Sequence, residues 1–600
     1  MPEPLSIRDT LTETRIFSKR AVVAVALVLL GAGMLLARYF HLQVVEHETY
    51  RTESDRNRIH ARPVPPRRGL IFDRNGVVVA DNRPIFNLMV TPERTGGLDR
   101  VLGLVGETIG LEAADEERFR KRLQRKRPFE AVPLRYNLGE EEIARLAVNR
   151  HRLPGVEVEA ELVRHYPFGA LLSHAIGYVG RINETELATL DPEDYAGTTL
   201  IGKNGIEKYH EGVLHGGVGY ENVETNARGR VLRVLERIDP VAGSDLVLDL
   251  DLAVQRVAMD TLAGKRGAVV AIDPQTGGVI ALASAPGFDP NPFVSGIGVA
   301  AYAALRDSPD HPLINRAIQG LYPPGSTVKP MYALAGLHYA LVTPETAVPD
   351  PGWYRLGGAG RRFRDWKKSG HGGAVDLAQA IVESCDVYFY DLAARMGMQR
   401  MHDFSIRFGF GSATGVDQSA ERRGVMPSNA WKLGAIGQPW YPGETLSVGI
   451  GQGYMLATPM QLAVMTATIA NRGRHYRPRL VARIGGKPVE PELLHTVEMP
   501  AAGDWDAVIG AMADVVHGPR GTARIISKDI GYRVAGKTGT AQVVGIADDA
   551  TYDASKLDER HRDHALFIAF APVEDPRIAV GSWWRTASTG AARRRRSRAA

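Results

Sequence analysis

The ten residues LYPPGSTVKP, Leu321–Pro330, decide how the rest of this 600-residue chain is interpreted. Ser326 and Lys329 are three positions apart, so on a helix they share one face and lie about one turn from each other. A Pro-Pro-Gly turn directly precedes them, as at the start of a helix. A hydroxyl is a poor nucleophile until a base takes its proton, and a neutral lysine amine can do this. The segment therefore predicts a serine nucleophile at the N-terminus of an apolar helix.

A second polar element follows along the chain. Residues Ala378–Ala394 have helical, mostly apolar spacing and are expected to form one helix that carries Ser384 and Asp386. A helix with a few unimportant polar positions is the alternative, because a short motif has meaning only in its structural context.

A third element lies close to the C-terminus. Arg533–Val544 is predicted to be a strand, because it combines small, β-branched and apolar residues. Its small residues would let a substrate backbone lie along the strand edge, and its lysine would supply a cation for a carboxylate. The residues of this strand that would lie beside the substrate are Lys537, Thr538, Gly539 and Thr540. A second Lys-Ser-Gly run, Lys368–Gly370, lies in a charged, turn-rich stretch, and we exclude it on that context.

Composition argues against nucleic-acid binding and for a membrane anchor. Apart from five arginines among the last eight residues, the 73 Lys and Arg residues equal the 68 Asp and Glu residues in number, so no broad basic face is expected. The apolar run over 21–37, extended to Leu42, is long enough to span a bilayer. Basic residues before it place the N-terminus in the cytoplasm, and no small-x-small cleavage site follows it. An uncleaved anchor is therefore favoured over a signal peptide.

Periodicity divides the chain into five parts. Residues 1–20 are a tail, 21–43 the anchor, and 44–240 a module of hairpins and helices without an acid–base cluster. Residues 241–580 are expected to form one α+β domain, because β runs near both of its ends flank helical segments and would share a sheet. Residues 581–600 form an atypical basic tail.

The ordered set Ser326-x-x-Lys329, Ser384-x-Asp386 and Lys537-Thr538-Gly539 resembles the motifs of the penicillin-binding protein and serine β-lactamase superfamily. The resemblance covers nearly the whole chain. Segments 68–76 and 202–207 are similar to class B penicillin-binding proteins, and 364–373, 439–445 and 447–461 to their penicillin-binding protein 2 branch, the elongation-specific D,D-transpeptidases. It implies an N-terminal transmembrane helix, an elongated β-rich pedestal of the dimerisation type over 44–240, and a transpeptidase domain over 241–580.

The resemblance also implies a reaction. Ser326 attacks the penultimate D-Ala carbonyl of a stem pentapeptide, releases the terminal D-Ala and passes the acyl group to an amine of a neighbouring stem peptide. Lys329 is the general base and Ser384 relays a proton towards the leaving amine. Lys537 and Thr538 hold the terminal carboxylate.

Two further roles complete this implied mechanism. The backbone N–H groups of Ser326 and Thr540 form the oxyanion hole. β-Lactams mimic D-Ala-D-Ala and trap Ser326. Asp386 stands where most relatives have Asn, and a carboxylate cannot donate a hydrogen bond unless it is protonated, so its role stays open.

Cys385 is the only cysteine, so no intramolecular disulfide can form. Within a continuous helix it would point away from its two neighbours, as a small buried hydrophobe does. Some penicillin-binding protein 2 relatives carry a structural zinc on an Asp, Asp, His, Cys set, and such donors suit tetrahedral zinc. By this resemblance we expect a structural zinc, and no cofactor for the chemistry itself. The matching residues are Asp350, Asp365, His371 and Cys385.

The last twenty residues, GSWWRTASTGAARRRRSRAA, do not look like the apolar strand that the sheet requires after Ile578. A one-base shift of the reading frame converts SWWRTA into an apolar residue followed by Val-Glu-Asn-Gly, which is similar to the family. We therefore predict a frameshift over 581–600. A genuine basic tail is the alternative, and it would leave the last strand missing.

Other functions stay open at this point. A D,D-carboxypeptidase differs only in using water as the acceptor, and a division-specific transpeptidase shares the architecture. A β-lactamase would be smaller and soluble, and a non-enzymatic β-lactam sensor or scaffold would be expected to carry a signalling domain.

The resemblance implies a bacterial inner-membrane protein with a periplasmic catalytic domain. Its ligands would be stem pentapeptides and β-lactams. No glycosyltransferase signature is present, so a SEDS-type glycan polymerase and other elongation-complex membrane proteins are the expected partners.

Overall fold

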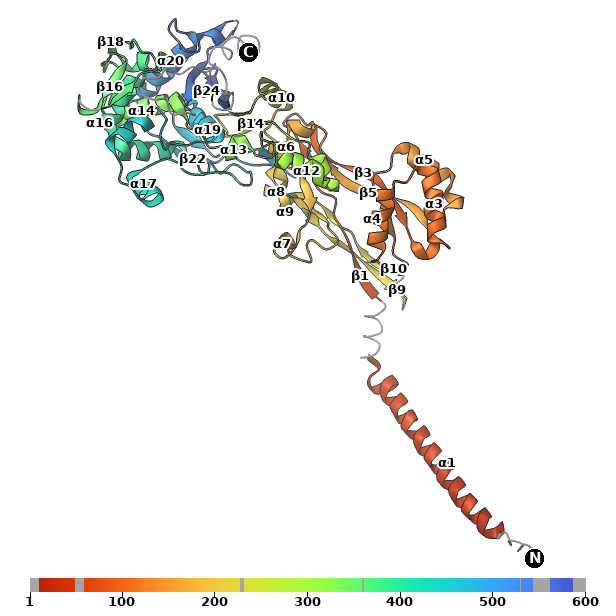
Figure 1. Cartoon of the computed structure of the whole chain (residues 1–600). Helices are drawn as coiled ribbons and strands as arrows, with labels where there is room; N and C mark the ends of the chain where they lie inside the picture. The colour runs from red at the N-terminus through yellow and green to blue at the C-terminus, as the bar shows by residue number, and fades with distance from the viewer. Residues whose placement is uncertain are drawn as a thin grey trace, which may run out of the picture. The chain divides into compact units, whose positions relative to one another are not determined.

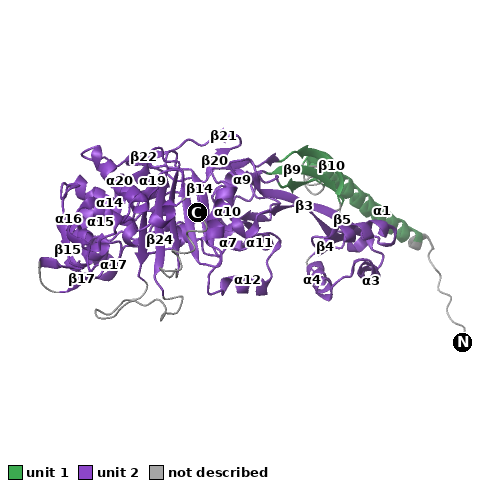
Figure 2. Cartoon of the chain, turned by 90° about the horizontal axis from the view of Figure 1, so that it is seen from above, with its two compact units in different colours: residues 1–65, 218–240 green, residues 66–217, 241–600 purple. Residues whose placement is uncertain are grey.

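The computed structural model describes residues 10–48, 59–124, 126–226, 231–358, 361–528, 530–542 and 562–585. The chain forms two compact units, one of residues 1–65 with 218–240 and one of 66–217 with 241–600 (Figure 2). The predicted pedestal range, 44–240, is thus shared between the two units.

The first unit contains a long helix and a small antiparallel sheet (Figure 1). Helix α1, Thr10–Phe40, continues into one π-helical turn, η1, His41–Val45. Its most apolar 18-residue window has a mean hydropathy of 2.3, so it is long and apolar enough to cross a membrane. The sheet has the order β1-β9-β10. Its strands are Ile59–Val64, Gly219–Thr225 and Val231–Ile238.

The second unit begins with a hairpin. Strands β2, Ile71–Phe72, and β3, Val78–Val90, pair antiparallel around the turn at Asp73. The Asp73 carboxylate accepts the N–H groups of Asn75, at 2.9 Å, and Val77, at 2.8 Å, which fixes the turn. β3 also pairs with two other strands, next to a small core with three helices. These elements are β4 Val132–Arg135, β5 Val156–His165, α3 Leu98–Ile109, α4 Ala113–Leu123 and α5 Glu140–Val148.

Two family-like motifs meet at a buried carboxylate. Glu207, in α8 (Gly205–Tyr209), is fully buried and accepts hydrogen bonds from Arg68 and Arg164, each at 2.7 Å. Although burial alone raises the pKa of Glu207, the two guanidinium groups hold that pKa below its usual range. Buried charges persist in proteins when they are paired in this way.

A five-stranded antiparallel sheet organises the catalytic part, with the order β14-β13-β25-β24-β23. Its first two strands come from the beginning of the predicted domain and its last three from the end, which confirms the expected shared sheet. Helices α19, Pro459–Ala470, and α20, Gly503–His517, pack against it. Among the described strands, β23 lies at the edge. The strands are β13 Gly267–Ile272, β14 Val279–Ala285, β23 Ala535–Ala541, β24 His564–Ala571 and β25 Ile578–Trp584.

The expectation that the sheet lacks a strand after Ile578 is wrong. β25 continues to Trp584 and pairs with both β13 and β24. Gly581 suits its place, because a Cβ there would lie 2.6 Å from the backbone nitrogen of Ala463 in α19. Trp583 is buried and stacks on Tyr322, with ring centroids 3.6 Å apart. The predicted frameshift thus cannot be inferred from a missing strand, and residues 586–600 lie outside the described residues.

The predicted single helix over 378–394 is also wrong. It is two helices, α15, Leu377–Val382, and α16, Asp386–Ser405, and Ser384 lies between them with φ +60°. The new helix is stabilised at its start. Cys385 Sγ accepts the N–H of Tyr388 at 3.3 Å, and Asp365 accepts the N–H of Asp386 at 2.7 Å. Donors in the first turn of a helix lack intrahelical partners, and these acceptors satisfy them.

Candidate active site

Ser326 lies in a short 3₁₀ turn, η5, Gly325–Val328, which continues directly into α14, Lys329–His338. The turn packs against the edge strand β23. Gly325 has φ +55°, and a Cβ at that position would lie 2.5 Å from the carbonyl oxygen of Thr540. Only glycine permits this approach, so the residue before Ser326 brings the serine next to the Lys537–Thr540 strand.

Lys329 joins the first two motifs. Its side chain is fully buried, and Nζ donates to the carbonyl of Ser384 at 2.8 Å and to Asp386 Oδ1 at 2.7 Å. Ser384 Oγ is a third acceptor at 3.4 Å. An ammonium group has three N–H donors, and three acceptors surround this one. The left-handed backbone at Ser384 turns its carbonyl and its hydroxyl towards the same amine.

The structure gives a reason for Asp at position 386. One carboxylate oxygen accepts from Lys329 Nζ, and the other accepts the backbone N–H of Trp366 at 3.0 Å. Both partners are donors. Asn offers only one acceptor oxygen and would place its NH₂ group against one of them. Asp386 thus neutralises Lys329 and holds the 366 loop at the same time.

Lys537, on β23, is fully buried. Burial, and secondarily the positive charge of Lys329, lower the pKa of Lys537 well below its usual range, against a weaker opposite effect of Asp386. Because η5 packs against β23, residues 329 and 537 lie in neighbouring elements despite their separation in sequence. Gly539 also lies against η5, because a Cβ there would be 2.7 Å from Thr327 Cγ2.

Sequence reasoning missed several residues of the site. Thr522 Oγ1 lies 2.9 Å from Thr538 Oγ1, and Gln452 Nε2 donates to the carbonyl of Thr540 at 3.0 Å. The carbonyl of Gly451 accepts the N–H of Gly325 at 2.8 Å. The alternating glycines in GIGQG, residues 449–453, were a usable signal for a close backbone approach. No sequence motif around Thr522 indicated that this residue belongs to the site.

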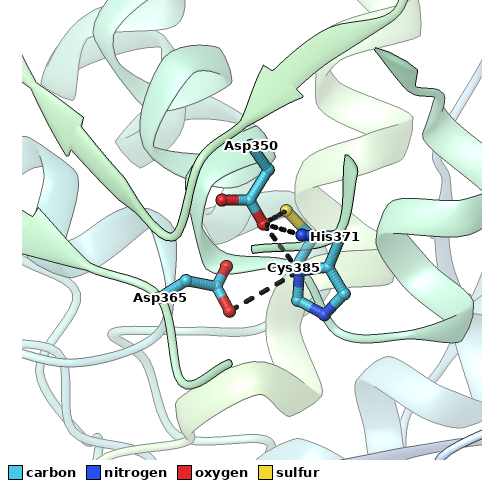
Figure 3. A group of neighbouring side chains, drawn as sticks. All are labelled: Asp350, Asp365, His371 and Cys385. Atoms are coloured by element: carbon cyan, nitrogen blue, oxygen red, sulfur yellow. Dashed lines mark hydrogen bonds and ion pairs between the residues drawn. The ribbon is translucent and has the colours of Figure 1, made fainter. Parts of the chain in front are cut away.

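A second buried cluster (Figure 3) adjoins the turn of Ser384 and Asp386, since it includes Cys385 between them and Asp365, which accepts the N–H of Asp386. It consists of Asp350, Asp365, His371 and Cys385, which are all buried and each offer one donor atom within 4.8 Å of the others. His371 Nδ1 is 2.6 Å from Asp350 Oδ2 and 3.6 Å from Asp365 Oδ1. Cys385 Sγ is 3.3 Å from Asp350 Oδ2. The sequence named the same four residues, and the fold brings them together.

The donor set fits a tetrahedral metal. Ligand bonds of 2.0–2.3 Å to zinc imply donor atoms roughly 3.3–3.8 Å apart. The separations of 3.3 Å and 3.6 Å lie in this range, and the 2.6 Å between His371 and Asp350 is shorter. Without a cation, burial and the neighbouring carboxylates raise the pKa of the Cys385 thiol. Burial and the Asp386 carboxylate likewise raise the pKa of Asp365. A bound cation would reverse both effects.

A serine beside a turn, a buried lysine three residues later and an edge strand with a Lys-Thr-Gly sequence define the class of penicillin-reactive serine acyltransferases. A family model described as penicillin binding protein transpeptidase domain matches residues 267–599. A second, described as penicillin-binding protein dimerisation domain, matches residues 63–248. The chain therefore belongs to the class B penicillin-binding proteins, within their penicillin-binding protein 2 branch.

Relatives along the whole chain define the activity. Peptidoglycan D,D-transpeptidase MrdA of Acinetobacter baumannii is 45% identical over 98% of this chain and 88% of its own length. The protein of the same name from Escherichia coli is 43% identical over 96% and 92%. Pseudomonas aeruginosa PBP2 in complex with WCK 5153 has a TM-score of 0.70 and 42% identity over 90% of this chain and 95% of its own. The predicted fold class and the predicted D,D-transpeptidase activity are confirmed.

Proposed function

We propose that Ser326 is the nucleophile that carries this transpeptidation, with Lys329, Ser384 and Lys537 around it. One observation supports this most directly. The Lys329 ammonium contacts Ser384 and Asp386, and the turn that carries Ser326 packs against Gly539 and Thr540 of β23, so three motifs far apart in sequence lie side by side. A mechanism in which all three motifs act on one substrate requires that they lie close together.

The two lysines supply a route for the proton. Lys329 is surrounded by acceptors, whereas the surroundings of Lys537 favour its neutral form. When the terminal carboxylate of a stem peptide reaches Lys537, it stabilises the charged form of this lysine. With the substrate bound in this way, the Lys329 amine takes the Ser326 proton as general base.

The acyl transfer then proceeds on β23. The Ser326 oxygen bonds to the D-Ala carbonyl carbon, and the N–H groups of Ser326 and Thr540 stabilise the oxyanion. The proton from Lys329 passes through Ser384 to the leaving D-Ala nitrogen. An amine of a second stem peptide attacks the ester, and Ser326 recovers its proton. The edge position of β23 supports this pose, since an exposed strand edge can pair with an extended peptide.

Mass spectrometry after exposure of the full-length protein to a labelled penicillin tests the nucleophile. The expected result is one adduct on the peptide that contains Ser326, and none in Ser326→Ala. An adduct on another residue would sink the proposal. Incubation with stem pentapeptides then separates the acceptors, because a transpeptidase yields cross-linked dimers and a D,D-carboxypeptidase yields only tetrapeptides.

We further propose that zinc occupies the cluster of Asp350, Asp365, His371 and Cys385. The metal would supply no step of the reaction. The cluster lies at the start of α16, and Asp365 also accepts the N–H groups of Asp386 and Val387. A cation there would therefore fix the turn that presents Ser384 and Asp386 to Lys329. Metal analysis of the purified protein should find one zinc per chain.

The anchor and the partners are proposed on similar grounds. Helix α1 would hold the chain in the inner membrane with the catalytic part in the periplasm, because Arg15, Lys19 and Arg20 precede its apolar stretch. Solved relatives include a complex of PBP2 with MreC from Helicobacter pylori and a peptidoglycan synthase complex. We expect a SEDS-type polymerase and an MreC-like protein as partners. Cysteine labelling before α1 and after it, from outside the cell, tests the orientation.

A further inference from the structure

Helix α17, Asn429–Ile436, is a short helix of the second unit (Figure 1). Its single buried residue is Lys432, whose side chain is fully buried. Of the other apolar side chains of the helix, Trp431 is half-buried with its ring centroid 5.6 Å from that of Tyr454, whereas Leu433 is 63% and Ile436 39% exposed. A helix normally buries its apolar face, so a lysine as the sole buried side chain requires a specific environment.

That environment is one carboxylate and three aromatic rings. Lys432 Nζ donates to Glu444 Oε1 at 2.5 Å. It lies 4.5 Å from the ring centroid of Tyr441, 5.6 Å from that of Tyr454 and 5.8 Å from that of Trp440. Aromatic faces at such distances attract a cation, and the effect grows when water is excluded. We call these five residues the Lys432 box.

The box is joined to the active site through two continuous elements. Glu444 is in the first turn of α18, Pro442–Gly449, and its second oxygen accepts the N–H of Tyr441 at 2.8 Å. α18 packs closely on α16, because a Cβ at Gly449 would lie 2.6 Å from Ala393 Cβ. The loop between the end of α18 and Tyr454 contacts Gly325, which precedes Ser326, and Thr540 on β23.

This loop, residues 450–453, is held from both sides. On the catalytic side Gly451 accepts the N–H of Gly325, and Gln452 donates to the carbonyl of Thr540. On the other side α18 and Tyr454 are both bound to Lys432. Within the loop, the N–H groups of Gly451 and Gln452 donate to the carbonyls of Val448 and Ser447 at 2.8 and 2.9 Å, so the position of the loop depends on the end of α18.

We propose that Lys432 is a positioning residue for acylation: its ammonium binds Glu444 and the aromatic rings, and so fixes the 450–453 loop against Gly325 and Thr540. The side chain does not touch the reacting atoms. It acts by keeping the oxyanion-side backbone in register with the serine. This inference rests on the proposed role of Ser326.

The Lys432 box requires the positive charge of the Lys432 side chain and not only its volume. Lys432→Met keeps a side chain of similar length without charge, but it leaves Glu444, whose side chain is 23% exposed, without its counter-charge, so a loss of stability is expected as well. We expect its first-order acylation constant for a labelled penicillin, k2, to fall about ten- to hundred-fold, because small misplacement of catalytic groups has effects of this size. The pre-acylation constant Ks should change little. Lys432→Arg, which keeps the cation, should stay within about threefold of the parent k2.

The experiment is stopped-flow acylation of the full-length protein in detergent, well below the unfolding temperature of each variant. Lys121→Met is the matched control, because Lys121 on α4 forms an exposed ion pair with Glu117 and should leave k2 unchanged. Glu444→Gln removes the counter-charge and should also lower k2, which keeps the test valid if Lys432→Met does not fold.

Two results would overturn the inference. One is a parental k2 in Lys432→Met or Glu444→Gln. The other is a loss in Lys432→Arg as large as in Lys432→Met, which would assign the effect to shape alone. Failure of the proposed nucleophile is a separate outcome, since it would appear as the absence of a Ser326 adduct in the unmodified protein.

Discussion

Two buried polar clusters share the residues Ser384–Asp386, and their charges are balanced in opposite ways. On the catalytic side two lysines, 329 and 537, face one carboxylate, Asp386. On the other side two carboxylates, a histidine and a thiol lie together without a lysine or arginine among them. The first cluster holds two amines beside one carboxylate, and burial lowers the pKa of one of these amines, Lys537. The second holds four ligands suited to a cation. A substrate carboxylate that reaches the first cluster would favour the charged form of Lys537, and a metal ion in the second would balance its carboxylates.

The largest effect is expected from the catalytic side. Lys329→Met removes the base and its contacts with Ser384 and Asp386. We expect penicillin acylation to fall by about 10³-fold or more, since a positioned general base contributes roughly 10²–10⁴-fold. Stopped-flow acylation checks this, with Lys121→Met as the control. Retention of more than a tenth of the rate would show that another group takes the Ser326 proton.

The metal side is expected to respond in stability. Cys385→Ala removes one ligand and the cap of α16, and should lower the free energy of unfolding by about 3 kcal/mol together with the zinc content. Denaturant unfolding and metal analysis measure both. Ser405→Ala, a buried hydroxyl on the same helix, should cost about 1 kcal/mol and keep the metal. Equal zinc in both variants would contradict the assignment.

The two clusters should also differ in their response to pH. The pKa of Lys537 is depressed in the folded protein, so between that pKa and 10.5 the unfolded chain binds more protons and stability rises with pH. One such group contributes a slope of up to about 1.4 kcal/mol per pH unit. Lys537→Met should therefore flatten the pH dependence of unfolding above neutrality. An unchanged slope would show that Lys537 is charged in the folded state.

The smallest effect is expected at Asp386, which contacts both clusters. Asp386→Asn keeps an acceptor for Lys329 but presents an NH₂ group to the N–H of Trp366. We expect a loss of about 1–2 kcal/mol in stability. Acylation should slow less than in Lys329→Met. Thermal unfolding measures the stability and stopped-flow acylation measures the rate. A more stable Asp386→Asn variant would refute the explanation that position 386 needs two acceptor oxygens, one for Lys329 and one for the N–H of Trp366.

Several features were predictable because they depend on local pattern. The strand expected over Arg533–Val544, which is β23, and the apolar helix expected after Ser326, which is α14, follow from composition and periodicity. The α15–α16 break was missed, because the acceptors that start α16 include Asp365, which lies far from it in sequence. β25 was missed for a similar reason. Its glycine and tryptophans look atypical until α19 and Tyr322 are packed against them.

The sequence by itself determined which chemical groups this protein has: a serine with a lysine one turn away, a Lys-Thr-Gly strand, an apolar anchor and four metal-type ligands. Hydroxyls, amines and thiols keep their intrinsic reactivity wherever they lie, so motifs suffice to name them. Only the tertiary structure decided how those groups act on one another. The burial of Lys537, the pairing of both Asp386 oxygens and the Lys432 box arise from contacts between distant segments, and electrostatic energies depend on distance and on the exclusion of water.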